Sequence, residues 1–195
     1  HNVYYLPTLF CPQKCIYCYA KTSALPERGD SLLTLARLRE LLAELRSLGV
    51  ESLQLSGGDV FARRDIFDVL EAVATAGLAM DIPTKLGLSF EQALRLRDLG
   101  IDSIQVSLDS TQPEVLDHMV GVHNYHRRAF RLLGDLRRAG LAVRVNCVLT
   151  PDNVGTVGML IDFLGQMGNV VRLTLTPYGR SLFCHQDRLF LDGEQ

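Results

Sequence analysis

The sequence repeats one pattern five times: an amphipathic segment ends in a glycine, and a short run of β-forming residues follows within a few positions. Glycine commonly ends helices, because it adopts the left-handed backbone conformation without a steric penalty. The pattern therefore predicts helices that each lead through a tight turn into a strand. The five glycines are Gly49, Gly77, Gly100, Gly140 and Gly168.

Six β-rich runs result when the N-terminal segment is added to the five runs that follow these glycines. Strict alternation of strand and helix predicts parallel strands joined by right-handed crossovers. We therefore predict an α/β fold with six parallel strands and five intervening helices. The predicted strands span residues 3–9, 52–55, 80–83, 103–108, 142–149 and 170–176.

The predicted helices carry further local signals. The first helix places leucines at spacings of three and four residues, which predicts one buried face. Ser89 and Gln92 have the spacing of a capping box at the start of the third helix, and Asp152 with Asn153 offers an N-cap to the fifth. The leucines of the first helix are Leu35, Leu38, Leu42 and Leu45.

Length and composition limit the class of protein. A chain of 195 residues and 21.7 kDa is sufficient for one α/β domain. Its 47% hydrophobic and 22% charged residues lie near the globular average, which excludes a disordered or collagen-like chain. Because the chain begins at His1 and the alternating pattern stops after Pro177, we expect residues 1–195 to form one core domain of a longer chain.

Charge and hydropathy limit the partners. Lys and Arg number 20 against 22 Asp and Glu, so the chain lacks the broad basic field that binds nucleic acid. The apolar stretch at residues 141–149 is broken by Arg144 and Asn146 and is far shorter than a membrane span. We therefore expect a cytoplasmic protein that binds neither nucleic acid nor membrane.

Three of the five cysteines lie in the turn after the first predicted strand. Cys11, Cys15 and Cys18 place three thiolates within eight residues, which suits a polynuclear metal centre in a reducing compartment better than a disulfide framework. A [4Fe-4S] cluster held by three cysteines leaves one iron open to a small molecule. The alternatives are a zinc site with a remote fourth ligand and a Cys15–Cys18 redox pair.

Cys147, on the apolar face of a strand, is predicted to be a core residue.

Ligands of parallel sheets bind at the carboxyl ends of the strands. Polar residues follow most of the predicted strands, so we expect their side chains to converge at this edge. Besides the cysteines, they are residues 56–59, Thr84, Lys85, residues 107–110, Asn146 and residues 177–178.

The three cysteines match the C-x3-C-x2-C signature of the radical S-adenosylmethionine (SAM) enzymes, and two further features agree with this match. The sequence Ser56-Gly57-Gly58-Asp59 lies where that family has its Gly-Gly-Glu motif. The six strand-helix units resemble the partial (β/α)6 barrel of the radical SAM core. Over essentially its whole length, the chain therefore resembles the radical SAM superfamily.

The resemblance implies two cofactors, a [4Fe-4S] cluster and SAM. Cys11, Cys15 and Cys18 would bind three irons, while the amino and carboxylate groups of SAM would chelate the fourth. An electron donor such as flavodoxin or ferredoxin would reduce the cluster. Reduction would cleave SAM to methionine and a 5′-deoxyadenosyl radical, which abstracts hydrogen from the substrate.

The resemblance also assigns residues of the first half of the chain to SAM. Tyr17 resembles the family's aromatic residue that packs on the adenine. Gly57 and Gly58 permit close backbone approach, and Asp59 is expected to accept a hydrogen bond from the SAM ammonium, although the family usually has Glu here. The alternative role for Asp59 is to cap the helix that begins near Asp65.

The fourth and fifth strands provide the other expected contacts with SAM. Ser107 and Asp109 resemble family residues near the ribose and methionine, and Asn146 resembles a polar ligand-facing residue. Arg144 shares the strand face of Asn146, so it either meets the SAM carboxylate or is a solvated charge. Lys85 lies in place of the Thr-Asn-Gly sequence common in relatives.

Residues 107–110 and 113–117 resemble those of peptide-modifying maturases and related cofactor-synthesis enzymes. We therefore expect the substrate to be a ribosomally made peptide, and the alternative is a small metabolite held by charged groups. An iron–sulfur electron-transfer protein and a zinc-stabilised binding domain are the alternatives from other classes. The six-strand scaffold with polar groups along its ligand edge disfavours both.

Overall fold

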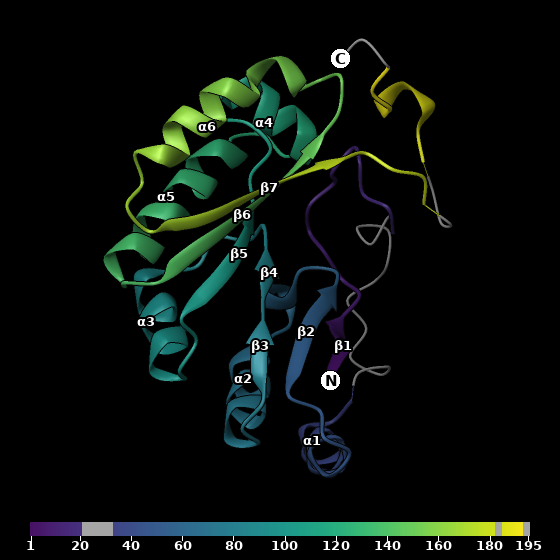
Figure 1. The fold of residues 1–195 in the computed structure, drawn as a ribbon, viewed down its shortest axis with the longest axis vertical. Helices are drawn as coiled ribbons and strands as arrows, with labels where there is room; N and C mark the ends of the chain where they lie inside the picture. Colours follow the sequence, from purple (N-terminus) through teal and green to yellow (C-terminus); the bar gives the residue numbers. More distant parts are fainter. Residues whose placement is uncertain (21–32, 182–184, 193–195) are drawn as a thin grey trace.

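The computed structural model describes residues 1–20, 33–181 and 185–192 and confirms the predicted α/β class. Every pair of neighbouring strands is parallel. The strands follow one curved path, with helices α3, α5 and α6 on one side of β5, β6 and β7 (Figure 1). The strands are β1 (Asn2–Thr8), β2 (Ser52–Gly57), β3 (Ala79–Asp81), β4 (Pro83–Thr84), β5 (Ser103–Ser107), β6 (Ala142–Leu149) and β7 (Val170–Pro177).

The third predicted strand is interrupted at Ile82, which divides the strands into two sheets. β3 belongs to a sheet of order β1-β2-β3, and β4 belongs to a sheet of order β4-β5-β6-β7. The break precedes Pro83, which has no backbone N–H for a sheet hydrogen bond. The Ile82 carbonyl still accepts a hydrogen bond from Gln105 at 2.9 Å, so the path from β3 to β4 continues. No closed barrel forms among the described strands, as expected for a partial barrel.

Within the described ranges, six helices occupy the five predicted helical segments, because the segment between β5 and β6 holds two. α4 ends at Val120, before Gly121, and α5 begins after Asn124. Gly121 and Asn124 both have positive φ, which breaks one long helix into two. Short 3-10 turns lie at Val60–Ala62, Val154–Thr156 and Asp187–Leu189. The helices are α1 (Leu35–Ser47), α2 (Ile66–Thr75), α3 (Phe90–Asp98), α4 (Pro113–Val120), α5 (Tyr125–Arg138) and α6 (Val157–Gly165).

Most of the local predictions for these helices are confirmed. The leucine stripe of α1 packs on the core, with Leu38 and Leu42 buried. Ser89 and Gln92 form the predicted capping box of α3. Four of the five glycines adopt the positive φ expected after a helix, but Gly168 does not, because α6 already ends at Gly165.

The predicted N-cap at Asn153 is wrong. Its buried side chain accepts a hydrogen bond from the Thr150 N–H at 2.8 Å and makes no capping contact. Its amide nitrogen donates to the carbonyls of Asp109 (2.8 Å) and Val148 (2.9 Å). Asn153 therefore joins the chain after β5 to the end of β6, a contact between segments distant in sequence.

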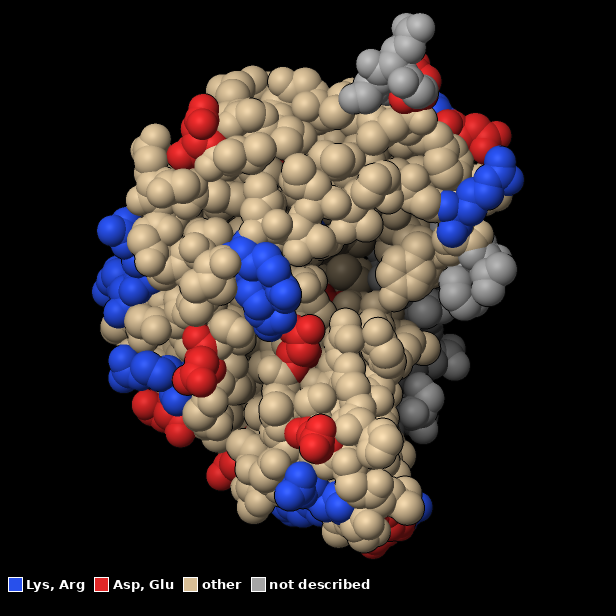
Figure 2. All heavy atoms as spheres, viewed as in Figure 1, with Lys and Arg blue, Asp and Glu red and all other residues tan. Residues whose placement is uncertain are grey.

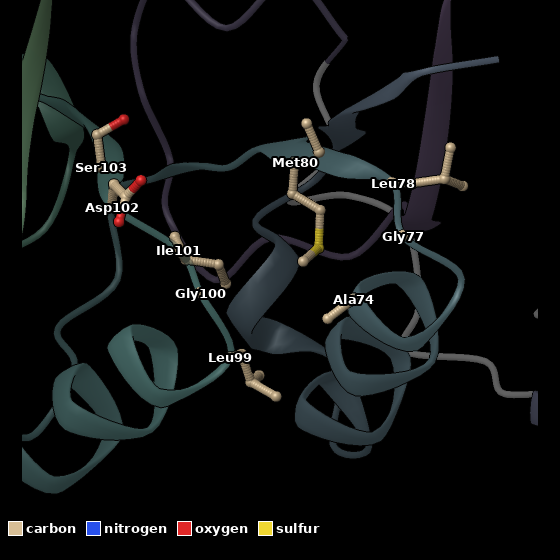
Figure 3. Close-up of a pocket in the computed structure, with 10 residues that line it drawn as sticks. Ala74, Gly77, Leu78, Met80, Leu99, Gly100, Ile101, Asp102 and Ser103 are labelled. Carbon is tan, nitrogen blue, oxygen red and sulfur yellow. The ribbon is translucent and has the colours of Figure 1, made fainter.

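A cavity of about 350 Å³ lies at the amino ends of β3 and β5 (Figure 3). The ends of α2 and α3 border it, and Met80, Leu99 and Asp102 are among its lining residues. Because the strands are parallel, this cavity is at the opposite end of the sheet from the cysteine turn, which follows β1.

The face drawn in Figure 2 has basic and acidic side chains interspersed, and its surface is hollowed near the centre. In the described part of the chain, no helix has the length and apolar character needed to cross a membrane.

Asn153→Ala tests the connection between β5 and β6. We expect it to lower the free energy of unfolding by at least about 2 kcal/mol, because each buried group left without its partner costs about 1–3 kcal/mol. Denaturant titration measures the loss. Ser89→Ala, which removes an exposed helix cap, is the control and should cost only about 1 kcal/mol. Equal losses in the two variants would contradict the role of Asn153.

Candidate active site

The cysteine turn, residues 11–18, is fastened to the end of α4 by backbone hydrogen bonds. The N–H groups of Lys14 and Ile16 donate to the carbonyls of Val120 and Met119, both at 3.0 Å. A Cβ atom at Gly121 would lie 2.5 Å from the Lys14 carbonyl oxygen, so glycine is needed at this contact. The turn therefore has a fixed backbone position against α4.

The three cysteines of this turn are half-buried thiols. Burial raises the pKa of the Cys15 thiol to about 11, although the nearby Lys85 ammonium opposes this shift. A thiol ligand must lose its proton, so metal binding at Cys15 would release one. No three metal-ligating side chains in the described ranges converge as a single-ion site requires. Three thiols in one turn of eight residues are the donor set that a [4Fe-4S] cluster takes, with each thiolate on a different iron.

The segment after β7 lies against the cysteine turn, which the sequence analysis did not anticipate. The Gln186 side-chain amide donates to the Ile16 carbonyl at 2.7 Å, and the Ser181 hydroxyl donates to the Tyr19 carbonyl at 2.9 Å. The carboxyl-terminal side of the last strand is thereby joined to the turn after the first.

The Gly57-Gly58-Asp59 turn contacts the end of β1 and the residues that follow it. The N–H groups of Gly58 and Asp59 donate to the carbonyls of Thr8 (2.9 Å) and Phe10 (3.1 Å). A Cβ atom would lie 2.3 Å from the Thr8 oxygen at Gly57 and 1.9 Å from the Phe10 oxygen at Gly58. The two glycines are therefore required by the chain's own backbone, whatever ligand the turn also meets.

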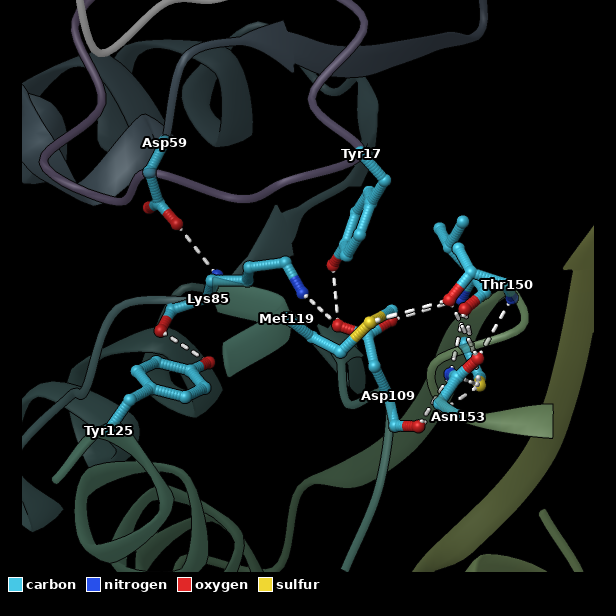
Figure 4. Close-up of polar contacts among 10 residues, drawn as sticks. Tyr17, Asp59, Lys85, Asp109, Met119, Tyr125, Thr150 and Asn153 are labelled. Atoms are coloured by element: carbon cyan, nitrogen blue, oxygen red, sulfur yellow. Dashed lines mark hydrogen bonds and ion pairs between the residues drawn. The ribbon is translucent and has the colours of Figure 1, made fainter. Parts of the chain in front are cut away.

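The carboxylate of Asp59 is buried and accepts hydrogen bonds from four protein donors, of which Figure 4 shows the Lys85 N–H. Four donors match the roughly four lone-pair sites of a carboxylate, so the expectation that Asp59 accepts the SAM ammonium is not supported. Its contact with Phe61 caps the 3-10 turn η3 (Val60–Ala62), not the helix near Asp65. The donors are the N–H groups of Phe61 (3.1 Å), Lys85 (2.7 Å) and Leu86 (3.1 Å) and the Thr84 hydroxyl (3.0 Å).

Asp109 joins the cysteine turn to two strands (Figure 4). One carboxylate oxygen accepts the Tyr17 hydroxyl at 2.5 Å and the Lys85 ammonium at 2.8 Å. The other oxygen accepts the Val148 N–H at 3.0 Å. Its side chain is fully buried, and that of Lys85 is 12% exposed. Tyr17, Lys85 and Asp109 thus form one polar cluster beside Cys15, in which Asp109 is fully buried and the other two are partly buried.

The ionisation of this cluster follows from its surroundings. Burial lowers the pKa of Lys85, but the charges of Asp109 and Cys15 raise it by more than burial lowers it. The pKa of Lys85 is therefore above the usual value for lysine. Burial, and next Asp109, raise the pKa of Tyr17. Lys85 is therefore charged at neutral pH, and the Tyr17 hydroxyl keeps the proton that it donates to Asp109.

Ser107 and Asn146 lie opposite each other in the register of β5 and β6. The Asn146 side-chain oxygen accepts a hydrogen bond from the Thr176 hydroxyl of β7 at 3.0 Å. Ser107 and Asn146 therefore lie side by side near the carboxyl ends of β5 and β6, at the same edge of the sheet as Asp109.

Arg144 has a partner that the sequence analysis did not foresee. Its guanidinium donates to the Asp81 carboxylate at 2.6 Å, which links β6 of one sheet to β3 of the other. Both roles considered for Arg144, a contact with the SAM carboxylate and a solvated charge, are replaced by this ion pair.

Arg63 was also missed by the sequence analysis. Its side chain is 3% exposed, pairs with Asp65 at 2.6 Å and donates to the carbonyls of Pro7 (3.0 Å) and Leu33 (3.2 Å). Asp65, two residues after Arg63, was a possible signal of an ion pair, but the two carbonyl partners of Arg63 come from segments distant in sequence. Arg63 holds the end of β1, from which the cysteine turn begins.

Comparison with known proteins gives a match over most of the chain. The profile of the Radical SAM superfamily matches residues 5–164. A PqqA peptide cyclase of Methylocella silvestris is 30% identical over 159 residues, which are 81% of this chain and 42% of the relative. A PqqA peptide cyclase of Streptomyces rochei is 30% identical over 172 residues, which are 86% of this chain and 46% of the relative. The chain spans less than half the length of these relatives.

Solved structures share the fold at lower sequence identity. SuiB of Streptococcus suis bound to S-adenosylmethionine has a TM-score of 0.80 and 20% identity, over 93% of this chain and 41% of that chain. The enzyme anSMEcpe with bound AdoMet and Cp18Cys peptide has a TM-score of 0.68 and 16% identity, over 91% of this chain and 51% of that chain. At these identities the likeness shows the fold alone.

Gly58→Ala tests the contact between the glycine turn and the chain before the cysteines. We expect a loss of about 1–3 kcal/mol in the free energy of unfolding, because the new Cβ collides with a backbone oxygen. Gly134→Ala is the matched control, since nothing lies within 4 Å of its Cβ position in α5 and alanine favours a helix by about 1 kcal/mol. Denaturant unfolding of both variants measures the difference, and a Gly58→Ala variant as stable as the wild type would refute the contact.

Proposed function

The chain belongs to the radical SAM superfamily, and we propose that it forms the core of an enzyme that uses a [4Fe-4S] cluster and SAM to abstract hydrogen from a peptide. The observation that supports this most strongly is the position of the cysteine turn. It is fixed at the carboxyl edge of the parallel strands, beside the Gly57–Asp59 turn and the buried cluster around Asp109.

We propose that Cys11, Cys15 and Cys18 hold three irons of the cluster. When bound, the cluster supplies one electron and SAM supplies the radical that abstracts hydrogen. The protein's own part is to fix the thiol-bearing turn through Lys14 and Ile16 and to keep the cluster surroundings partly buried. Partial burial limits the access of water to a reactive centre.

Residues on three segments are proposed to bind SAM. Tyr17 offers an aromatic ring from the cysteine turn, and the backbone at Gly57 and Gly58 lies beside that turn. Ser107 and Asn146 offer polar groups from β5 and β6. In this proposal Asp109 orients Tyr17 through their hydrogen bond, and Asp59 holds the glycine turn without touching the ligand.

A peptide is the proposed substrate, supported by two observations. The relatives reported above are named as peptide cyclases, and one structural neighbour was solved with a peptide. β7 also lies at the end of its sheet, and most of its residues are exposed, so an extended peptide could add to the open edge by strand pairing.

The interior charges weigh against a compact anionic metabolite. Lys85 is paired with Asp109, and Arg144 is paired with Asp81. Arg180 lies over the ring of Phe190, at 5.7 Å from its centroid. The two interior cations, Lys85 and Arg144, are therefore neutralised by the protein itself, whereas Arg180 is exposed at the surface. Flavodoxin or ferredoxin remains the proposed electron donor.

Anaerobic reconstitution tests the cluster. We expect about four irons and four sulfides per chain, and loss of both in variants with Ala at positions 11, 15 or 18, because each thiolate binds a separate iron. Iron and acid-labile sulfide assays measure the content. Cys147→Ala is the control that removes a buried thiol from β6, outside the turn, and it should retain the cluster. Stoichiometric zinc without sulfide would contradict the proposal.

Hydrogen transfer tests the reaction and the substrate class. The reconstituted full-length enzyme is incubated with SAM, a reductant and deuterated candidate substrates, and 5′-deoxyadenosine is analysed by mass spectrometry. We expect deuterium to arrive from a peptide encoded next to the enzyme's gene. Deuterium arriving only from a small metabolite would overturn the substrate proposal, and no cleavage of SAM by an intact cluster would favour a simple electron-transfer protein.

A further inference from the structure

A buried positive charge lies beside the cysteine turn. The Lys85 ammonium is 5.2 Å from the centroid of the Tyr17 ring, and Tyr17 stands between Cys15 and Cys18 in the sequence. The same ammonium and the Tyr17 hydroxyl share one oxygen of Asp109. The Lys85–Asp109 charge pair thus contacts the cysteine turn at Tyr17.

The protein holds the backbone of this lysine from two sides. Its N–H donates to the Asp59 carboxylate at 2.7 Å, and its carbonyl accepts the Tyr125 hydroxyl at 2.9 Å. Both partners are buried. Asp59 is therefore a positioning residue for Lys85, and the ammonium is placed by the same contacts that fix the glycine turn.

Charges in such a place act strongly on a neighbouring redox centre. Electrostatic interactions are stronger in a buried site than in water, and the potential of an iron–sulfur cluster depends on nearby charge and on solvent exposure. One-electron reduction adds a negative charge to the cluster without breaking or forming a bond. A nearby cation favours the reduced cluster, and a nearby anion disfavours it.

We propose that Lys85 and Asp109 form a charge pair that sets the reduction potential of the cluster on the cysteine turn, Lys85 raising it and Asp109 lowering it. The inference rests on the proposed function, because it needs the cluster to assemble. It assigns Lys85 to the cluster and not to the substrate.

Redox titration of the reconstituted protein without SAM tests this pair. Iron and sulfide are measured first, and the midpoint potential is then followed by electron paramagnetic resonance in the presence of dye mediators. The variants are Lys85→Met, which keeps the aliphatic stem, Lys85→Arg, which keeps the charge, and Asp109→Asn. Lys14→Met is the matched control, because Lys14 precedes Cys15 in the same turn but is exposed to water.

We expect Lys85→Met to shift the potential to more negative values and Asp109→Asn to shift it to more positive values. The midpoint potential of Lys85→Arg should stay near that of the wild type. Lys14→Met should shift the potential less than Lys85→Met does, because water screens an exposed charge. If Lys85→Met does not assemble a cluster, the proposal is tested with Asp109→Asn and with the Lys85→Met/Asp109→Asn double variant. The midpoint potential of the double variant is expected to be near that of the wild type.

Two results separate failure of this inference from failure of the proposed function. A wild-type protein that binds no iron and sulfide would refute the proposed function itself. Intact clusters with unchanged potential in Lys85→Met or Asp109→Asn, or equal shifts in Lys85→Met and Lys85→Arg, would overturn the role of the charge pair alone.

Discussion

Two backbone hydrogen bonds, from Gly58 to Thr8 and from Asp59 to Phe10, join the glycine turn to the chain that enters the cysteine turn. They require two strands to end side by side with no side chain between them. The glycines satisfy that requirement, and the Asp59 side chain extends the connection to Lys85, which directly follows β4. The cysteine turn is therefore placed by the ends of β1, β2 and β4 together.

The second theme of the structure is that buried charges are neutralised inside the protein. Lys85 pairs with Asp109, and Arg144 pairs with Asp81 across the two sheets. Burying an unpaired charge costs several kcal/mol, so removal of one partner is expected to be more harmful than removal of both. We propose that the Lys85–Asp109 pair acts on the cofactor site, that the Arg144–Asp81 pair stabilises the fold, and that a peptide binds at the exposed edge of β7.

The sequence was sufficient for features that depend on neighbours in the chain. Alternation of helices and strands, the capping box at Ser89 and the three-cysteine turn all follow from local spacing. The break at Ile82 also had a local signal, since Pro83 follows it. The sequence analysis predicts one continuous strand over residues 80–83, so it does not predict this break.

The features that the sequence did not predict are contacts between distant segments. Three of the four donors to Asp59 lie 25 to 27 residues away, in and directly after β4, and Arg144 and Asn153 also have partners that are remote in sequence. A motif can show that a carboxylate is present at a ligand edge, but it does not show how many protein donors already surround that carboxylate. For Asp59, four donors do so, and the structural role that we propose for this residue rests on them.

We propose that three cysteines hold a cluster with one iron left open to SAM. Electron-nuclear double resonance on the reduced cluster, with SAM labelled with nitrogen-15 in its amino group, tests this most directly. The account predicts a hyperfine coupling between the cluster spin and the labelled nitrogen. A fully reduced cluster that shows no such coupling at saturating SAM would contradict it.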